Sequence, residues 1–162
     1  MDTRGKILSR EGLNDVVREH RRDGRRIVFG NGVFDLLHAG HIRYLEAARA
    51  QGDVLVVGIN SDASTRKLKG EGRPILTERD RAALVAAVAA VDFVVIFDEI
   101  DAKSLLREIQ PDVHAKGTDY SPESVPEGEL AGRLGIRVAI VGDPKRHSTR
   151  DLLARFRRPN DG

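Results

Sequence analysis

Short apolar segments alternate with helical patterns along most of the chain, and no other feature restricts the fold as strongly. The strand candidates are residues 26–29, 54–59, 93–97, 113–115 and 138–141, which are rich in β-branched or other apolar residues. Apolar residues recur at helical spacing in residues 10–22, 40–51, 79–90, 102–109 and 127–134. Strands that are apolar on both faces and separated by helices are typical of a parallel sheet covered on both sides. The sequence therefore predicts an α/β fold with a doubly wound, five-stranded parallel sheet.

The length of the chain indicates one domain. A chain of 162 residues can bury a core of its own and falls within the usual range for one domain. We therefore expect a single domain over residues 1–162. Its residues 1–24 are expected to form an N-terminal helical extension, with Ser9 before the helix and Gly24 at its end. The longest expected loop is 119–128, which contains two prolines.

Composition excludes several classes of site and partner. The chain has no cysteine, which rules out disulfides, thiolate metal sites and thiol chemistry. Its longest apolar stretch, residues 82–97, is interrupted by Asp92 and is shorter than the roughly 20 residues of a membrane-spanning helix. We expect neither a membrane segment nor a secretory signal, and the cytoplasm is the expected compartment. Arginines cluster at 18–26 and 155–158 with few aromatic residues, so solvated helix faces are expected there and no nucleic-acid partner.

The segment after the first predicted strand carries the features of an anion site. It reads Gly-Asn-Gly-Val-Phe-Asp over residues 30–35 and leads to His38-Ala39-Gly40-His41, where a helix is expected to begin. Glycines let backbone amides approach a ligand, and the positive end of the helix dipole points to the same place. Because His38 and His41 are three residues apart, both imidazoles can face one direction. They could donate hydrogen bonds to phosphate oxygens as charge moves to a leaving pyrophosphate, without a covalent intermediate.

Two other interpretations of the histidine pair stay open at this point. Either histidine could be a helix cap or a core residue, although a glycine-rich strand end followed by two histidines favours a ligand site. A metal site is the second alternative, with Asp35 as a further ligand. It lacks the cysteine or second acidic partner at ligand spacing that a zinc centre needs.

Further polar residues follow the predicted elements. Asp35 and Asp62 come after the first two strands and would accept hydrogen bonds from substrate hydroxyls, although Asp35 could also cap a helix. Lys69 belongs to a basic stretch that we expect to be mobile and able to close over phosphates. Lys67 is a weaker candidate in the same stretch. A solvated surface lysine is the alternative for both.

Two helix starts provide additional anion-binding groups. Thr77 is expected to cap a helix that carries Arg81, whose planar fork could bridge phosphate oxygens or a ribose. A surface arginine without a ligand is the alternative. Ser148 and Thr149 open the last expected helix, where their hydroxyls could cap the helix or hold a phosphate.

Taken together, the motifs resemble those of the cytidylyltransferase-like superfamily of nucleotidyltransferases, which is marked by a glycine turn, a Phe-Asp pair and a His-x-Gly-His motif. The resemblance covers about residues 26–156. It includes Asn60-Ser61-Asp62, Lys67-Leu68-Lys69-Gly70, Arg73-Pro74, Arg81, Lys116-Gly117-Thr118-Asp119-Tyr120 and His147-Ser148-Thr149. Within the superfamily the chain is most similar to the heptose 1-phosphate adenylyltransferases, which occur alone or as the C-terminal half of bifunctional kinase/adenylyltransferases. The resemblance implies a Rossmann-like fold.

The resemblance also implies roles for individual residues. The implied catalytic residues are His38, His41 and Lys69. The implied nucleotide-binding residues are Asn31, Gly32, Val33, Phe34, Gly40, Arg81, Lys116, Gly117, Asp119, Ser148 and Thr149. The implied substrate-binding residues are Asp35, Asn60, Asp62, Lys67 and Arg73. No protein ligand of a metal is implied, and Mg²⁺ is expected on the nucleotide phosphates.

The reaction implied by the resemblance is transfer of AMP from ATP to D-glycero-D-manno-heptose 1-phosphate. It would yield ADP-heptose and pyrophosphate for lipopolysaccharide or a related glycan, with an upstream heptose kinase and a homodimeric state. The alternatives are a CTP-dependent relative, such as a glycerol 3-phosphate cytidylyltransferase, and a nucleotide-binding regulator without catalysis. Two departures from the pattern, Thr118 in place of a glycine and Arg150 in place of a threonine, affect the expected nucleotide contacts.

Overall fold

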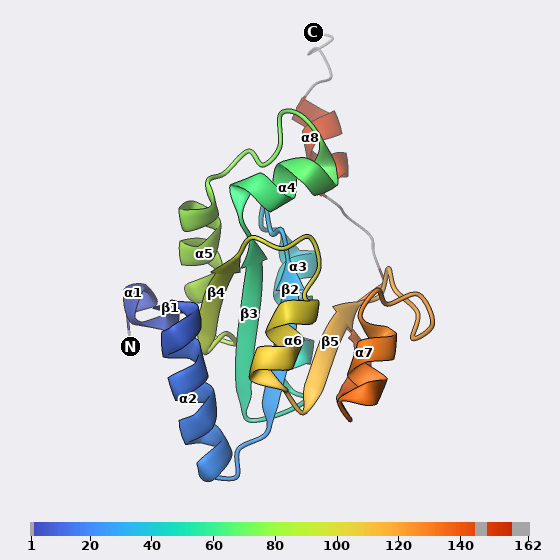
Figure 1. Cartoon of the computed structure of the whole chain (residues 1–162). Helices are drawn as coiled ribbons and strands as arrows, with labels where there is room; N and C mark the ends of the chain where they lie inside the picture. Colours follow the sequence, from blue (N-terminus) through green and yellow to red (C-terminus); the bar gives the residue numbers. More distant parts are fainter. Residues whose placement is uncertain (1, 145–148, 157–162) are drawn as a thin grey trace, which may run out of the picture.

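A six-stranded parallel sheet forms the centre of the protein. The computed structural model describes residues 2–144 and 149–156. The strands are β1 (Ile7–Leu8), β2 (Ile27–Gly32), β3 (Val54–Asn60), β4 (Phe93–Phe97), β5 (Val113–Gly117) and β6 (Arg137–Val141), in the order β1-β4-β3-β2-β5-β6 (Figure 1). Nearly every residue of β2 to β5 is buried, as expected for strands covered on both faces.

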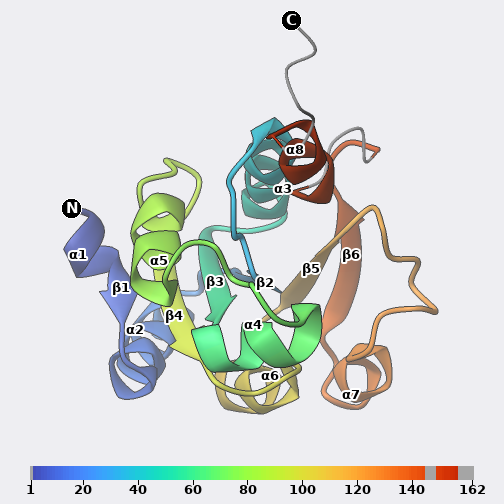
Figure 2. The ribbon, with the colours of Figure 1, turned by 90° about the horizontal axis from the view of Figure 1, so that it is seen from above.

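Helices cover both faces of the sheet. They are α1 (Thr3–Lys6), α2 (Arg10–Arg22), α3 (Ala39–Arg49), α4 (Asp62–Lys69), α5 (Glu78–Ala86), α6 (Lys103–Ile109), α7 (Gly128–Arg133) and α8 (Thr149–Phe156). Figure 2 shows α2, α6 and α7 along one face, with α3 and α5 along the other. Two separate hydrophobic clusters lie between these helices and the sheet. Each cluster is built from alternate residues of the same strands, because successive side chains of a strand point to opposite faces.

The strand order of the sheet reverses at β2, because the strands that follow it in sequence are added first on one side of it and then on the other. The chain passes from β2 outward through β3 to β4, then returns to place β5 on the other side of β2, followed by β6. Gly30 of β2 is therefore paired with Val57 of β3 and with Ala115 of β5. In sheets of this kind a ligand binds beyond the carboxyl ends of the strands where the order reverses. The segments after β2 and β5 border that place.

The predicted α/β fold and its five strands are confirmed, but the sheet contains one more strand. Residues Ile7 and Leu8 pair with Val94 and Val95 at the edge of the sheet as β1. The N-terminal segment is thus not purely helical as expected. Two residues are too short to show an alternating pattern, so this strand depends on the β4 edge that it covers.

Other element bounds also differ from expectation. The glycine-containing residues 30–32, expected as a turn, are the last residues of β2. The stretch that contains Lys69, expected to be mobile, is mostly helix α4, which begins at an N-cap, Ser61, whose Oγ accepts a hydrogen bond from Ser64 N. Helix α5 ends at Ala86, four residues before the predicted end. No helix in residues 2–144 and 149–156 has the length and apolar character needed to span a bilayer.

Candidate active site

The two histidines lie at the start of α3, directly after the end of β2. His38 is the N-cap of the helix, and its Nδ1 accepts a hydrogen bond from Gly40 N at 3.2 Å. The rings of His38 and His41 are stacked with their centroids 3.9 Å apart. Because Nδ1 of His38 is an acceptor, the proton of the neutral ring is on Nε2. The predicted pairing of the two imidazoles at a helix N-terminus is therefore what the structure shows.

Phe34 shapes the approach to the histidines. Its backbone has a φ of 49°, which is uncommon for a residue other than glycine, and its ring lies 5.2 Å from the ring of His41. A Cβ atom on Gly32 would come within 2.9 Å of the Phe34 ring. Glycine at position 32 thus lets this ring pack against the strand end and support the side of His41.

Asp35 holds the loop between α4 and α5. Its carboxylate accepts hydrogen bonds from the backbone N–H groups of Ile75 and Leu76, at 2.9 and 3.0 Å, and forms a 2.7 Å ion pair with Arg73 Nε. Burial alone would raise the pKa of Asp35, but the donors from Leu76, Ile75 and Arg73 hold it below its ordinary value. With a side chain that is 1% exposed, Asp35 is turned toward the loop, and its contact with a substrate hydroxyl stays a prediction.

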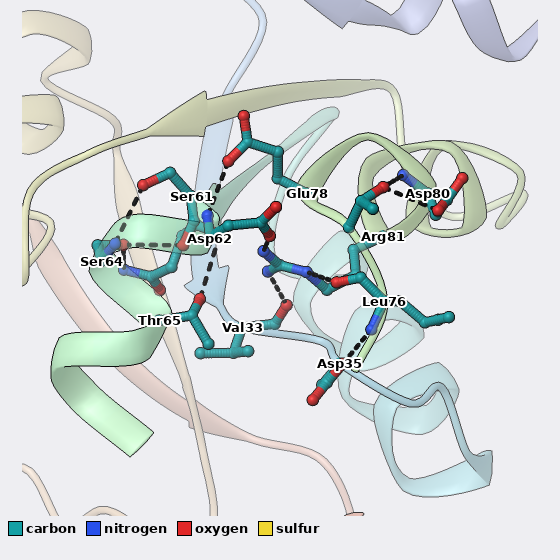
Figure 3. Close-up of polar contacts among 12 residues, drawn as sticks. Val33, Asp35, Ser61, Asp62, Ser64, Thr65, Leu76, Glu78, Asp80 and Arg81 are labelled. Carbon is teal, nitrogen blue, oxygen red and sulfur yellow. Dashed lines mark hydrogen bonds and ion pairs between the residues drawn. The ribbon is translucent and has the colours of Figure 1, made fainter. Parts of the chain in front are cut away.

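Arg81 also points into the protein. The side chain is fully buried, with Nη1 donating to Val33 O at 2.7 Å and Nε to Leu76 O at 3.1 Å. Its Nη2 forms a 2.8 Å ion pair with Asp62 (Figure 3). These partners differ from the expected phosphate or ribose. Arg81 instead connects the segment after β2, the loop before α5 and the start of α4.

Residues at the start and end of α4 have contrasting environments. The buried Asn60 donates through Nδ2 to Ser64 Oγ at 3.2 Å and to Glu99 O at 3.3 Å, so it organises the turn into the helix. Asp62 receives Arg81 on its carboxylate, while its N–H donates to Glu78 at 2.7 Å. At the other end, Lys67 and Lys69 are exposed in the last turn. Of the implied substrate-binding and catalytic residues of α4, the two lysines are thus exposed, whereas the Asp62 side chain is 28% exposed.

The end of β5 contributes a second set of implied nucleotide-binding residues. Lys116 and Gly117 are the last residues of this strand, and a Cβ on Gly117 would lie 2.9 Å from Asp119 Oδ1. Thr118, the departure from the family pattern, donates its hydroxyl to Asp143 O at 2.8 Å. The threonine thereby connects the β5 end to the segment that follows β6.

His114 is a buried residue that the sequence did not single out. It stacks on Phe29 with ring centroids 5.6 Å apart, and its Nε2 lies 3.1 Å from Oδ1 of Asn31. The Lys116 Nζ lies 3.5 Å from the same oxygen and 3.5 Å from Glu127 Oε2. The signal was present in the alternation of β5, where two polar residues occupy one face of a strand that is otherwise apolar.

The burial of His114 leads to a prediction about acid stability. Desolvation, with a smaller effect of the Lys116 charge, lowers the pKa of His114 from 6.5 to about 3. The unfolded state therefore binds more protons than the folded state between these values, so stability should fall as pH decreases from 6.5 toward 3. Between pH 7 and pH 5, we expect the melting temperature of His114→Gln to decrease less than that of the unmutated protein, as measured by circular dichroism. Equal losses would contradict a buried neutral histidine.

The start of α8 returns to the segment that leads to the histidines. The Oγ1 of Thr149 lies 3.5 Å from Leu36 O, which places this threonine beside the approach to α3. Figure 2 likewise shows α8 on the α3 side of the sheet. The implied phosphate-binding residue Ser148 lies outside the described residues, as do Arg157 and Arg158 of the C-terminal arginine cluster.

The structure therefore brings the implied site residues to one edge of the sheet. Some of them lie around the histidine pair, whereas others, such as Asp35 and Arg81, make contacts inside the protein. His38, His41, Gly40, Phe34 and Thr149 lie around the end of β2 and the start of α3. In the described part of the chain, no three His, Asp or Glu side chains are grouped so that they could hold a metal ion.

Comparisons with known proteins extend this picture. The family model described as cytidylyltransferase-like matches residues 29–133. Proteins named "Bifunctional protein HldE" are 46% identical in Syntrophotalea carbinolica, over 93% of this chain and 31% of the relative, and 50% identical in Wolinella succinogenes, over 87% and 30%. The chain spans about a third of the length of the relatives it matches.

A solved structure shares the fold. The lipopolysaccharide core biosynthesis protein from Thermoplasma volcanium is 31% identical and has a TM-score of 0.64. It matches 75% of this chain and 100% of its own length. The matched region corresponds to a complete chain in that protein.

Proposed function

The chain belongs to the cytidylyltransferase-like family, and we propose that it is a nucleotidyltransferase that transfers AMP from ATP to a sugar 1-phosphate. The proposed acceptor is D-glycero-D-manno-heptose 1-phosphate, and the products are ADP-heptose and pyrophosphate. The pairing of His38 with His41 at the α3 N-terminus, beside the β2/β5 switch point, carries this proposal.

The histidine pair suits the charge that develops in such a reaction. An oxygen of the sugar phosphate attacks the α-phosphorus of ATP in line, the new P–O bond forms, and the bond to the bridging oxygen of pyrophosphate breaks. The attacking oxygen already carries negative charge, so no proton has to be removed from it. Imidazole N–H donors and the backbone amides at the helix start stabilise the negative charge on the phosphates.

Accessible lysines and Mg²⁺ complete the proposed charge balance. The exposed side chain of Lys69 can reach a phosphate as a point charge, because it lies at the end of α4 on the carboxyl side of the sheet (Figure 1). Mg²⁺ would be carried by the nucleotide phosphates and would neutralise part of their charge. In this arrangement the protein contributes positioning and donors.

The resemblance to the heptose 1-phosphate adenylyltransferases favours a heptose acceptor. The relatives are bifunctional proteins of the HldE type, and the structural neighbour acts in the synthesis of the lipopolysaccharide core. We propose that this chain serves the same kind of pathway. A heptose kinase would then have to supply the sugar 1-phosphate before this reaction can occur.

A pyrophosphate-release panel tests both the nucleotide and the acceptor. ATP and CTP are each combined with heptose 1-phosphate, glycerol 3-phosphate and pantetheine phosphate in the presence of Mg²⁺. We expect release with ATP and heptose 1-phosphate. Release with CTP and glycerol 3-phosphate alone would contradict the proposed substrates, and no release from any pair would indicate a nucleotide-binding regulator.

A further inference from the structure

Four polar side chains form a connected row on the α6/α7 face of the sheet, near the carboxyl ends of β2 and β5. The row runs from Glu127 through Lys116 and Asn31 to His114, and we refer to it as the Asn31 network. Glu127 also accepts a hydrogen bond from Ala102 N at 3.2 Å, which fixes its carboxylate. Three of the four residues are at most 5% exposed, whereas Asn31 is half-buried.

The chemistry of the donors fixes the orientation of the Asn31 amide. A lysine ammonium can only donate, so the Asn31 atom that faces Lys116 is the oxygen. The same oxygen faces His114 Nε2, which must then carry a proton. Burial lowers the pKa of His114, which agrees with a neutral ring protonated on Nε2. With Oδ1 held by two donors, the NH₂ group of Asn31 points away from them, because both atoms lie on the same planar carbon.

Asn31 lies where its NH₂ group could contact a bound ligand. Asn31 is the second-last residue of β2, beside the switch point and one residue before Gly32. No described residue accepts a hydrogen bond from its Nδ2. Gly58, its neighbour on β3, has no side chain, and the rings of Phe29 and Phe97 lie 3.0 and 3.1 Å from where its Cβ would be.

We propose that His114 and Lys116 are positioning residues that hold the Asn31 amide with its NH₂ group toward the nucleoside triphosphate, where it donates to an oxygen or ring acceptor of the nucleotide. This assignment rests on the proposed function. It also reassigns Lys116, which binds Asn31 and Glu127 and thus acts on the nucleotide through Asn31. The family resemblance implies no role for His114 or Glu127. In the proposal, His114 holds the Asn31 amide, and Glu127 holds Lys116 through its ion pair.

The energetic character of the network supports a role beyond stability. Burying a lysine, a glutamate and a histidine carries a desolvation cost that an apolar set of similar size would avoid. Connected buried polar groups instead fix one arrangement of side chains, although His114 Nδ1 and Glu127 Oε2 have no hydrogen-bond partner among the described residues. Here the arrangement that they fix is the direction of one amide group.

Asn31→Asp tests the donor itself. Aspartate keeps the shape of the side chain and still accepts from His114 and Lys116, so the fold is retained, but it has no NH₂ group. We expect affinity for ATP, measured by calorimetry, to fall roughly tenfold or more, because a hydrogen bond to a charged or strongly polar ligand group is lost and a negative charge is added. Arg79→Ala, an exposed change on α5, serves as the control and should bind ATP normally.

A matched pair at position 114 tests the positioning role without changing the charge. His114→Gln can place an amide N–H where His114 Nε2 lies, whereas His114→Phe keeps the stacking on Phe29 and removes the donor. We expect KM for ATP to rise about fivefold in His114→Phe with little change in kcat, and to stay within about twofold in His114→Gln. A purely structural role would instead change melting temperature in both variants while KM stays constant.

A direct measurement complements the variants. In ¹⁵N-labelled protein, the His114 ring should show the neutral tautomer protonated on Nε2, and the Asn31 NH₂ signals should shift when ATP is added. Protonation on Nδ1, or unchanged ATP affinity in Asn31→Asp when the unmutated protein binds ATP, would overturn the inference and leave the proposed function intact. If the unmutated protein binds neither ATP nor CTP, both the proposed function and this ligand assignment fall.

Discussion

Replacing His41 with alanine is expected to lower kcat for pyrophosphate release by about two to three orders of magnitude, the usual cost of removing one preorganised donor to developing charge. The His41 ring stacks on His38 at 3.9 Å and is supported by Phe34, so its position is fixed before substrate binds. Because its contribution is greatest when charge moves to the leaving pyrophosphate, kcat and kcat/KM should fall together. Steady-state kinetics with ATP and heptose 1-phosphate measure both constants.

Arg43→Ala provides the control for this experiment. Arg43 lies two residues further along α3 and forms an exposed ion pair with Asp143, at 3.2 Å, which should contribute little to stability or turnover. Near-normal turnover of a folded His41→Ala protein would disprove the proposed role of the histidine pair. Circular dichroism establishes that both variants are folded.

The second large effect concerns stability. Arg81→Met should destabilise the protein by about 3 kcal/mol, the lower end of the range for breaking a buried ion pair, because Asp62 keeps part of its contact with water. Methionine has a similar volume but no donors. The carbonyls of Val33 and Leu76 therefore lose their hydrogen-bond donor, and the Asp62 carboxylate loses its ion-pair partner. Urea unfolding gives the change in free energy.

Arg79→Ala separates this effect from a general loss of charge on α5. Arg79 lies on the same helix and is exposed, so its replacement should change stability by less than about 0.5 kcal/mol. If Arg81→Met were as stable as the unmutated protein but failed to bind ATP, Arg81 would be a ligand-binding residue as the sequence indicated, and the inward contacts would not describe its role.

The sheet could be predicted because the strands are short, apolar and covered on both faces. Periodicity and caps located β2 to β6 and most helices, and the Thr77 cap before α5 is confirmed by the 3.2 Å hydrogen bond from Asp80 N to its hydroxyl. Strand β1 escaped prediction because two residues carry no periodic signal. Helix α4 escaped because its polar and basic residues show little of the apolar pattern that marks a helix.

The arrangement of the candidate site could be predicted where it depends on neighbours in sequence, and less so where it depends on neighbours in space. His38 and His41 are paired by helical spacing alone. The inward direction of Arg81 depends on Val33, which precedes it by 48 residues. The link from His114 to Asn31 spans 83 residues and exists because β5 returns to pair with β2. One sequence does not contain this information in any local pattern.

The contact between Asp35 and the α4–α5 loop depends on the loop backbone and not on the side chains at positions 75 and 76. Asp35 binds the backbone N–H groups of Ile75 and Leu76, not their side chains. Any residue except proline supplies such a group. The loop that crosses the carboxyl edge of the sheet can therefore exchange the side chains at positions 75 and 76 without losing its attachment beside the histidines (Figure 2). Selection for a new acceptor could act on such positions while the phosphate chemistry beneath them is inherited unchanged.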